Sequence, residues 1–196
     1  MKRIYFLIAF LAFGMFSYAQ ETSVWSLTYN MSVPMGKTTD FVGKTSFRGI
    51  ALEGRQFIDN NFSLGGSFGW CVFYEKKDKV TTEFENITLT GTHYRYLNTY
   101  PIYVNAAYYL NEGSYIRPYL AANVGLIVTD YRNDIGVYTL RESPAKFGFA
   151  PELGILIETE GGTGFTLNLK YNMGTETQDT KAFSSLGINV GFIWVY

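Results

Sequence analysis

The stretch SVWSLTYNMSVP, residues 23–34, alternates large apolar residues with small polar ones along its whole length. Trp25, Leu27 and Tyr29 fall on one face, whereas Ser26 and Thr28 fall on the other. A period of two residues is typical of a β-strand with two unlike faces. The same alternation returns in FTLNLKYNM, residues 165–173, and in SLGINVGFIWVY, residues 185–196. The chain is therefore predicted to be built from two-faced strands.

Eight such segments follow one another, with short and long connections alternating between them. The predicted strands span residues 23–34, 46–57, 62–75, 95–110, 115–130, 146–159, 164–175 and 183–196. Three short turns near 59–61, 111–113 and 160–162 alternate with four longer loops at 35–45, 76–94, 131–145 and 176–182. Aromatic residues, which favour strands, make up 18% of the chain. The pattern predicts an all-β fold of eight antiparallel strands.

Three features predict that the apolar faces contact lipid. The opposite faces are rich in Gly, Ser and Asn, which fit the narrow interior of an eight-stranded barrel. The predicted strands are longer than the usual ~5–6 residues, and they are long enough to cross a membrane at a tilt. Aromatic residues at strand ends match the interfacial girdles of membrane barrels. These residues are Trp25, Phe62, Tyr100, Tyr131, Phe147 and Trp194. A secreted soluble barrel with its apolar faces inside is the alternative.

Closure of the sheet follows from its surroundings. An open edge in hydrocarbon leaves backbone groups unpaired, so the first and last strands must pair. An even strand number places both termini of the mature chain on the side of the short turns, which is periplasmic in bacterial barrels. We therefore expect an eight-stranded antiparallel transmembrane β-barrel of the outer membrane, with short periplasmic turns, long extracellular loops and both mature termini in the periplasm.

The N-terminal segment has the form of a cleavable export signal. Lys2 and Arg3 precede an apolar run over residues 4–16, and small residues follow up to Ala19. The run is shorter than the ~20 residues of a membrane-spanning helix. Cleavage after Ala19 leaves residues 20–196 as one barrel domain. The loss of two basic residues changes the net charge from −1 to −3, which argues against a nucleic-acid partner.

Several stretches resemble a known family. Residues 47–55, FRGIALEGR, and 59–70, DNNFSLGGSFGW, are similar to the small outer-membrane β-barrel family of the OmpW, OmpX and OmpA-barrel proteins. Residues 149–154, FAPELG, resemble another recurrent piece of that family. The last strand ends in Tyr196, and it resembles the aromatic-ended strand that the barrel-assembly machinery recognises, although most such strands end in Phe. The resemblance implies this machinery as a partner.

Charged residues within the predicted strands fall on the inward faces, because an ion facing lipid is costly. We expect them to form an interior network of ion pairs and hydrogen bonds that plugs the lumen. The six residues are Glu53, Arg55, Arg117, Glu152, Glu158 and Lys170. Counting from the turns places Glu53, Glu152 and Lys170 near mid-height and the other three nearer the periplasmic mouth. An ion or proton path gated by Lys170 is the alternative.

The sequence offers little for catalysis. A Ser nucleophile needs a base, and the chain has a single His, His93, which is expected on the surface at the end of the longest loop. A single Cys, Cys71, is expected to fill space in the interior. One His and one Cys far apart do not form a metal site. No catalytic residue, metal ligand or cofactor is therefore predicted.

The expected function is structural or interactive. The loop at 76–94 begins with lysines and continues into a Thr-rich segment, a polar surface suited to lipopolysaccharide phosphates or to another envelope protein. Outer-membrane lipid and lipopolysaccharide are the expected surroundings. Three alternatives stay open: a narrow channel for small or apolar solutes, a lipid A-modifying enzyme, and an accessory subunit of an envelope complex.

Overall fold

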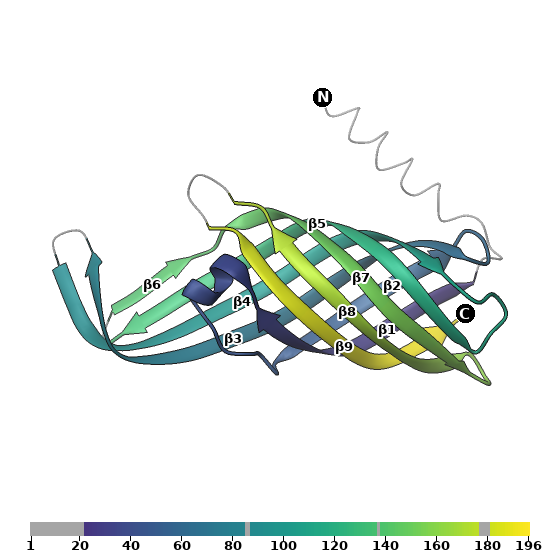
Figure 1. Ribbon diagram of the computed structural model, residues 1–196, viewed down its shortest axis with the longest axis horizontal. Coiled ribbons are helices and arrows are strands. Elements are labelled where there is room, and N and C mark those ends of the chain that lie inside the picture. The colour runs from purple at the N-terminus through teal and green to yellow at the C-terminus, as the bar shows by residue number, and fades with distance from the viewer. Residues whose placement is uncertain (1–21, 85–86, 137, 177–180) are drawn as a thin grey trace, which may run out of the picture.

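The chain folds into a closed antiparallel β-barrel (Figure 1). A computed structural model describes residues 22–196 apart from 85–86, 137 and 177–180, so the predicted signal peptide lies outside the described residues. Within the described part, eight strands form the barrel wall, and a short ninth strand pairs only with β5. The predicted fold class is confirmed.

The barrel strands match the predicted segments closely at most of their ends. They are β1 Ser23–Pro34, β2 Gly49–Phe57, β3 Phe62–Phe84, β4 Ile87–Tyr109, β5 Ile116–Ile135, β7 Ala145–Thr159, β8 Thr163–Gly174 and β9 Phe183–Val195, with β6 Tyr138–Glu142 as the additional strand. A five-residue 3-10 helix, η1 Gly36–Asp40, follows β1. No helix in the described part of the chain has the length and hydrophobicity needed to cross a membrane.

Pairing between β1 and β9 closes the barrel. Their register runs without a break from Val24 opposite Val195 to Pro34 opposite Ser185. The wall therefore has no open edge at this seam, as the hydrocarbon environment requires.

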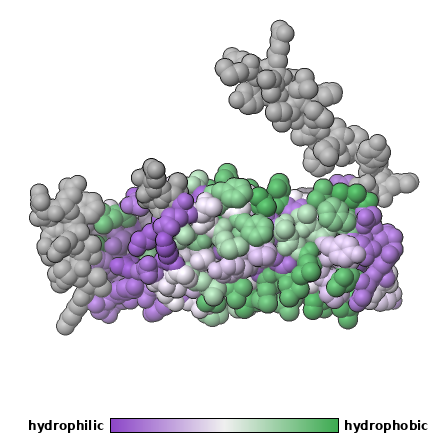
Figure 2. Space-filling model, turned by 45° about the horizontal axis from the view of Figure 1, so that its top comes forward, coloured by the Kyte–Doolittle hydropathy of each residue, from purple (hydrophilic) through white to green (hydrophobic). Residues whose placement is uncertain are grey.

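The two faces of the wall are the reverse of those in a soluble barrel. On β8, Phe165 and Leu167 are 50% and 49% exposed, whereas Thr166 and Asn168 between them are buried. Figure 2 shows hydrophobic residues gathered along the wall and hydrophilic residues at both ends. Apolar side chains outside and polar ones inside are the arrangement of a barrel that lies in lipid.

The two ends of the barrel differ in construction. The turn end carries three short connections, at 58–61, 110–115 and 160–162, together with Ser23 and Val195 at the ends of the wall. Its third turn uses Gly161 and Gly162 at φ values of 96° and 74°, which side-chain-bearing residues rarely adopt. The loop end carries η1, β6 and the protruding parts of β3 and β4 (Figure 1).

For two of the predicted loops, the predicted secondary structure is wrong. Residues 76–84 and 87–94 continue β3 and β4 as paired strands beyond the barrel, and the predicted loop at 131–145 contains the end of β5 and all of β6. Polarity suggested loops here, but Thr is β-branched and favours strands, and backbone pairing between neighbouring strands does not require an apolar face. The wall is thus extended on one side at the loop end.

The extension of these strands also changes the positions of two side chains. His93 was expected on the surface, but it is fully buried, because β4 runs through it and directs it to the same side as Leu97. Tyr131 was expected in the outer aromatic girdle, but it faces inward and packs against Phe41 with ring centroids 5.1 Å apart. Cys71 is buried inside, as predicted.

Candidate functional site

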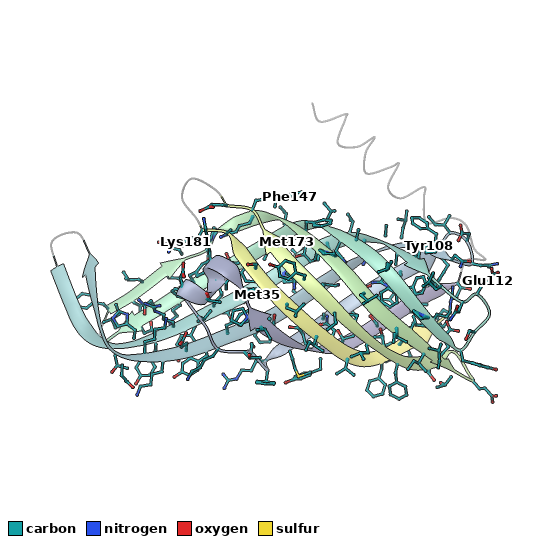
Figure 3. The ribbon with its side chains drawn as sticks, viewed as in Figure 1. Met35, Tyr108, Glu112, Phe147, Met173 and Lys181 are labelled. Carbon is teal, nitrogen blue, oxygen red and sulfur yellow. The ribbon has the colours of Figure 1, made fainter. Side chains whose placement is uncertain are left out.

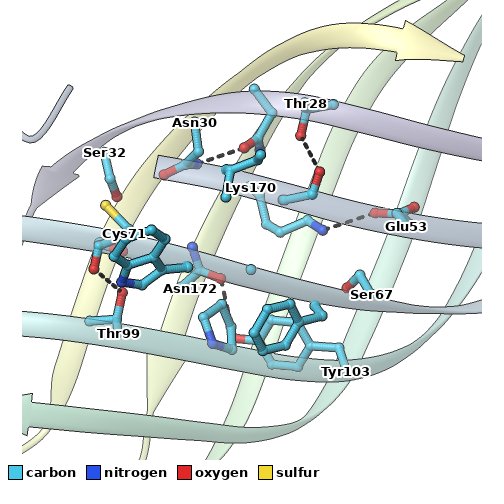
Figure 4. Close-up of a pocket in the computed structure, with 18 of the residues that line it drawn as sticks. Thr28, Asn30, Ser32, Glu53, Ser67, Cys71, Thr99, Tyr103, Lys170 and Asn172 are labelled. Atoms are coloured by element: carbon cyan, nitrogen blue, oxygen red, sulfur yellow. Dashed lines mark hydrogen bonds and ion pairs between the residues drawn. The ribbon is translucent and has the colours of Figure 1, made fainter. Parts of the chain in front are cut away.

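The lumen holds a compact charge network at mid-height. Lys170 Nζ lies 3.2 Å from Glu53 Oε2 and 3.0 Å from Glu152 Oε2. Arg55 Nη2 lies 2.9 Å from Glu152 Oε1, and Arg55 Nε pairs with Glu53. Figure 4 shows Lys170 extended toward Glu53 inside the barrel. Two cations and two carboxylates therefore balance each other within a buried space, as buried ions require.

Strand register brings these four residues together. Glu152 on β7 lies directly opposite Lys170 on β8. Glu53 and Arg55 are two residues apart on β2, so both face inward. The β2 pair reaches the β7 and β8 pair across the lumen, because β2 is not adjacent to either strand in the sheet. Closure of the barrel thus builds the network.

Glu152 is the centre of the hydrogen bonding. Its Oε1 accepts a hydrogen bond from Tyr119 at 2.8 Å in addition to the one from Arg55. Its Oε2 accepts one from Asn123 Nδ2 at 3.0 Å. With the Lys170 ammonium, the carboxylate has four partners, which compensate for its complete loss of water.

A row of amides extends the network around the wall. Asn30 Nδ2 donates to Asn189 Oδ1, and Asn189 Nδ2 donates to Asn168 Oδ1, both at 2.6 Å. Asn168 Nδ2 then donates to the Tyr119 hydroxyl at 3.2 Å. The polar chain therefore runs from Asn30 on β1 through Tyr119 to Glu152. The sequence pattern placed the asparagines on the inner face, but it gave no sign of the tyrosine that joins them to the charges.

A small cavity of about 40 Å³ adjoins the network on the side of the loop end (Figure 4). Its polar lining includes Asn30, Asn172 and Lys170, together with the hydroxyls of Thr28 and Tyr103. A water molecule needs ~10–15 Å³ of such space, so the cavity has room for about three. We call this cavity the central chamber.

The remaining two charged residues lie apart from this network. Arg117 Nη1 is 3.9 Å from Glu158 Oε1 at the turn end. The Arg117 guanidinium also lies over the rings of Phe57 and Tyr109, at 4.9 Å and 5.0 Å from their centroids. Arg55 was placed in this region from the sequence, but its long side chain reaches the central group. The structure therefore brings four of the six residues together and leaves Arg117 and Glu158 as a separate pair.

Aromatic rings separate the two charged groups. Phe57 and Tyr109 have centroids 4.8 Å apart, and Tyr109 and Tyr119 have centroids 5.0 Å apart. Val24, Leu156 and Ile193 pack in the same buried cluster. We call this cluster the turn-end layer. The sequence did not reveal it, because aromatic residues were expected on the lipid face.

A second apolar cluster closes the other side of the central network. It contains Val42, Cys71, Phe73, Leu97, Tyr103, Ile127, Ala150 and Phe183. We call it the loop-end layer. Val42 comes from the segment after η1 and is fully buried, so this segment caps the barrel from the loop end. Thr38 Oγ1 accepts a hydrogen bond from Ser184 N at 2.8 Å and holds the cap against β9.

Comparisons with known proteins agree with this architecture. A family model described as outer membrane protein beta-barrel domain matches residues 6–193. The comparison with curated proteins gave no match. The part of the chain that the structure describes contains no group of three or more His, Cys, Asp or Glu residues arranged to hold a metal ion.

Three solved structures are similar in fold. Ail of Yersinia pestis, in complex with the heparin analogue sucrose octasulfate, has 16% identity and a TM-score of 0.57, covering 90% of this chain and 99% of Ail. OprG from Pseudomonas aeruginosa has 12% identity and a TM-score of 0.59, with 90% and 96% covered. Neisserial surface protein A has 15% identity and a TM-score of 0.56, with 88% and 96% covered. At these identities the likeness concerns the fold. Because the family model spans nearly the whole chain, the protein belongs to the outer membrane protein beta-barrel domain family and is an outer-membrane β-barrel protein.

Proposed function

We propose that the protein is a closed, non-conducting barrel that has a structural or interaction role through its ends. The observation that carries this proposal is the filling of the lumen by three successive layers. The turn-end layer, the central charge network and the loop-end layer follow one another along the barrel. In this proposal the turn end faces the periplasm and the loop end faces outward.

The energetic cost of opening the lumen favours a permanently closed barrel over a gated channel. A continuous water path through the centre requires separation of Lys170 and Arg55 from their carboxylates. Removing one partner of a buried ion pair costs about 3–5 kcal/mol, because the other charge is left uncompensated. The network contains several such pairs, so separating them all is costly. A path must also pass the turn-end layer and the loop-end layer, which offer apolar surface to an ion. Three barriers in series favour a lumen that stays shut.

Single-channel recording in planar bilayers tests this proposal. We expect the mature refolded protein to give a silent bilayer. The variant Lys170→Ala is also expected to be silent, because the apolar layers on both sides remain. Heat-modifiable electrophoretic mobility provides the control for folding and insertion. Discrete openings in the wild-type protein, altered by Lys170→Ala, would overturn the plugged barrel in favour of a gated pore.

One observation favours a second candidate, a narrow path for small solutes. Pairing of β3 with β4 is interrupted between Phe68 opposite Ile102 and Cys71 opposite Thr99. Pro101 lies in this interval, and it has no backbone N–H to donate. The central chamber borders the interruption, since Pro101 and Trp70 are among its lining residues. A lateral route from the chamber through the wall would start here.

Solute uptake into liposomes separates the two candidates. If a lateral route operates, Pro101→Ala restores a backbone donor and lowers the rate of uptake. A matched substitution, Pro118→Ala on β5, leaves this part of the wall unchanged. Liposomes with no uptake above the empty control support the closed barrel.

A catalytic role has less support. The lipid-modifying alternative depended on His93, whose Nδ1 lies 3.3 Å from Asn133 Nδ2 inside the extended sheet. Its Nε2 is buried and has no hydrogen-bond partner among the described residues. Among the described side chains no hydroxyl is hydrogen-bonded to this imidazole, and we propose that the protein is not an enzyme.

Two partner assignments complete the proposal. Lys76 and Lys77 at the loop end suit contact with lipopolysaccharide phosphates, although Lys76 is 3.0 Å from Asp78 and Lys77 is 3.8 Å from Glu75. The last strand, β9, suits recognition by the barrel-assembly machinery, because it ends beside the exposed aromatic Tyr196. Replacement of Tyr196 by Ala is expected to slow assembly into the membrane in cells.

A further inference from the structure

A cavity of about 440 Å³ lies at the loop end, outside the plugged lumen. Sites for small organic molecules have volumes of ~300–1,000 Å³, so this cavity is of suitable size. Four segments that are distant in sequence meet around it: η1 with the residue after it, β4, the end of β5 with β6, and the residues before β9. Lys181, which precedes β9, lies near η1 in Figure 3.

Cations outnumber carboxylates in the lining. Lys37, Arg95, Arg141 and Lys181 line the cavity, against Asp40 and Glu142. Three of these cations are already neutralised. Lys37 is 2.7 Å from Glu176, Arg141 is 2.8 Å from Asp130, and Lys181 is 3.8 Å from Asp40. Arg95 is the one lining cation with no carboxylate partner among the described residues.

Arg95 is positioned rigidly. Its Nη1 donates to the backbone oxygens of Asp40 at 3.1 Å and Phe41 at 3.2 Å. Its guanidinium lies 5.4 Å from the centroid of the Phe41 ring. Its Nε is buried and has no hydrogen-bond partner in the described part of the chain. A buried donor without a partner needs an explanation, and a bound anion supplies one.

The same cavity offers an acceptor and an apolar wall. Asn133 Oδ1 is buried without a hydrogen-bond partner in the described part of the chain, while its Nδ2 is occupied by His93. Phe41 and Tyr131 meet edge to face, and Leu140 adds an aliphatic surface. The lining thus combines an unpaired cation, an unpaired acceptor and two aromatic rings.

We propose that this cavity binds a small organic monoanion with a flat apolar body. The carboxylate of the ligand binds Arg95, the ring packs against Phe41 and Tyr131, and a hydroxyl group donates to Asn133. A single negative charge fits best, because Arg95 is the one lining cation without a carboxylate partner among the described residues and Glu142 in the same lining repels further negative charge. Binding here is independent of conduction, since a closed barrel and a conducting one carry the same cavity.

Calorimetric titration of the mature protein in lipid nanodiscs tests the site, with para-hydroxybenzoate as the probe. The neutral analogue para-hydroxybenzyl alcohol tests the need for charge. We expect the probe to bind at least about tenfold more tightly than the neutral analogue, as charge-assisted hydrogen bonds are the stronger class. Equal binding of the two compounds, or no binding of the probe, would overturn the proposal.

Variants locate the binding. Arg95→Gln is expected to lower the affinity for the probe at least about tenfold, whereas Arg95→Lys recovers part of this loss of affinity. Asn133→Ala lowers affinity for the probe but leaves benzoate, which has no hydroxyl, unchanged. The matched control is Arg132→Gln, which removes a loop-end charge that is paired with Asp134 and does not line the cavity. If Arg132→Gln lowers the affinity for the probe as much as Arg95→Gln does, the probe binds through nonspecific electrostatic attraction to the loop end. That result would refute the site. Should Arg95→Gln fail to fold, Asn133→Ala and the neutral analogue still decide the result.

Discussion

Replacement of Glu152 by Gln tests the central charge network most directly. The substitution keeps the size of the side chain and removes one of two buried negative charges. Arg55 and Lys170 are then left with only Glu53, so the lumen contains one uncompensated positive charge. Breaking a buried pair in this way costs about 3–5 kcal/mol. We expect the free energy of unfolding to fall by that amount.

Urea unfolding in lipid vesicles, followed by Trp fluorescence, provides the measurement. With a dependence of about 1–3 kcal/mol per molar urea, the midpoint moves down by at least about 1 M. Glu160→Gln in an exposed turn is the matched control, and we expect it to change the free energy by less than about 0.5 kcal/mol.

A double variant separates charge balance from packing. Adding Lys170→Met to Glu152→Gln leaves one cation, Arg55, with one carboxylate, Glu53. We expect the double variant to be more stable than the sum of the single losses predicts, by ~0.5–3 kcal/mol. A loss below about 1 kcal/mol for Glu152→Gln, the value of an exposed pair, would refute a desolvated network. Strict additivity in the double variant would refute the coupling.

Three further predictions concern other parts of the barrel. Gly191→Ala places a methyl 2.0 Å from a backbone oxygen of β1, so we expect a loss of ~1–3 kcal/mol in the urea assay, whereas Gly91→Ala, with no atom nearer than 3.8 Å, is neutral. Val42→Ala removes two buried carbons from the loop-end layer and is expected to cost about 1.6 kcal/mol; a neutral result would mean that the cap does not pack. The Lys37 hydrogen bond lowers the pKa of Glu176, so this contact stabilises the fold above the ordinary Glu pKa of 4.5 and is lost as pH falls through the lowered value. Carboxyl NMR titration should show a midpoint below 4.5 that rises in Lys37→Met, and an unchanged midpoint in that variant would contradict the pairing.

Residue alternation was enough to predict the barrel itself. Segments such as 23–34 and 165–173 have one face that suits lipid and another that suits a crowded interior. The contrast between the two faces determines which side chains point in. Membrane physics then requires the sheet to close, and the inward position of charges such as Glu53 and Lys170 follows from the cost of an ion in lipid.

Alternation was a poor guide at the loop end. The segment 76–94 is rich in charged residues and Thr, so its sequence did not show the contrast of apolar and polar faces by which the other strands were recognised. Phe73, Leu97 and Ile127 escaped detection for the opposite reason, because these strands carry apolar residues on both faces in that region. Only the folded wall shows that these three side chains meet inside.

What the sequence determined by itself was the strand pattern, the lipid-facing surface and the set of inward charges. What the tertiary structure decided was which of these charges meet. A period of two gives the face on which a residue lies, but the partners across a lumen depend on the closure and stagger of all eight strands. For that reason Arg55 forms an ion pair with Glu152 in the central network, whereas Arg117 and Glu158 pair with each other at the turn end.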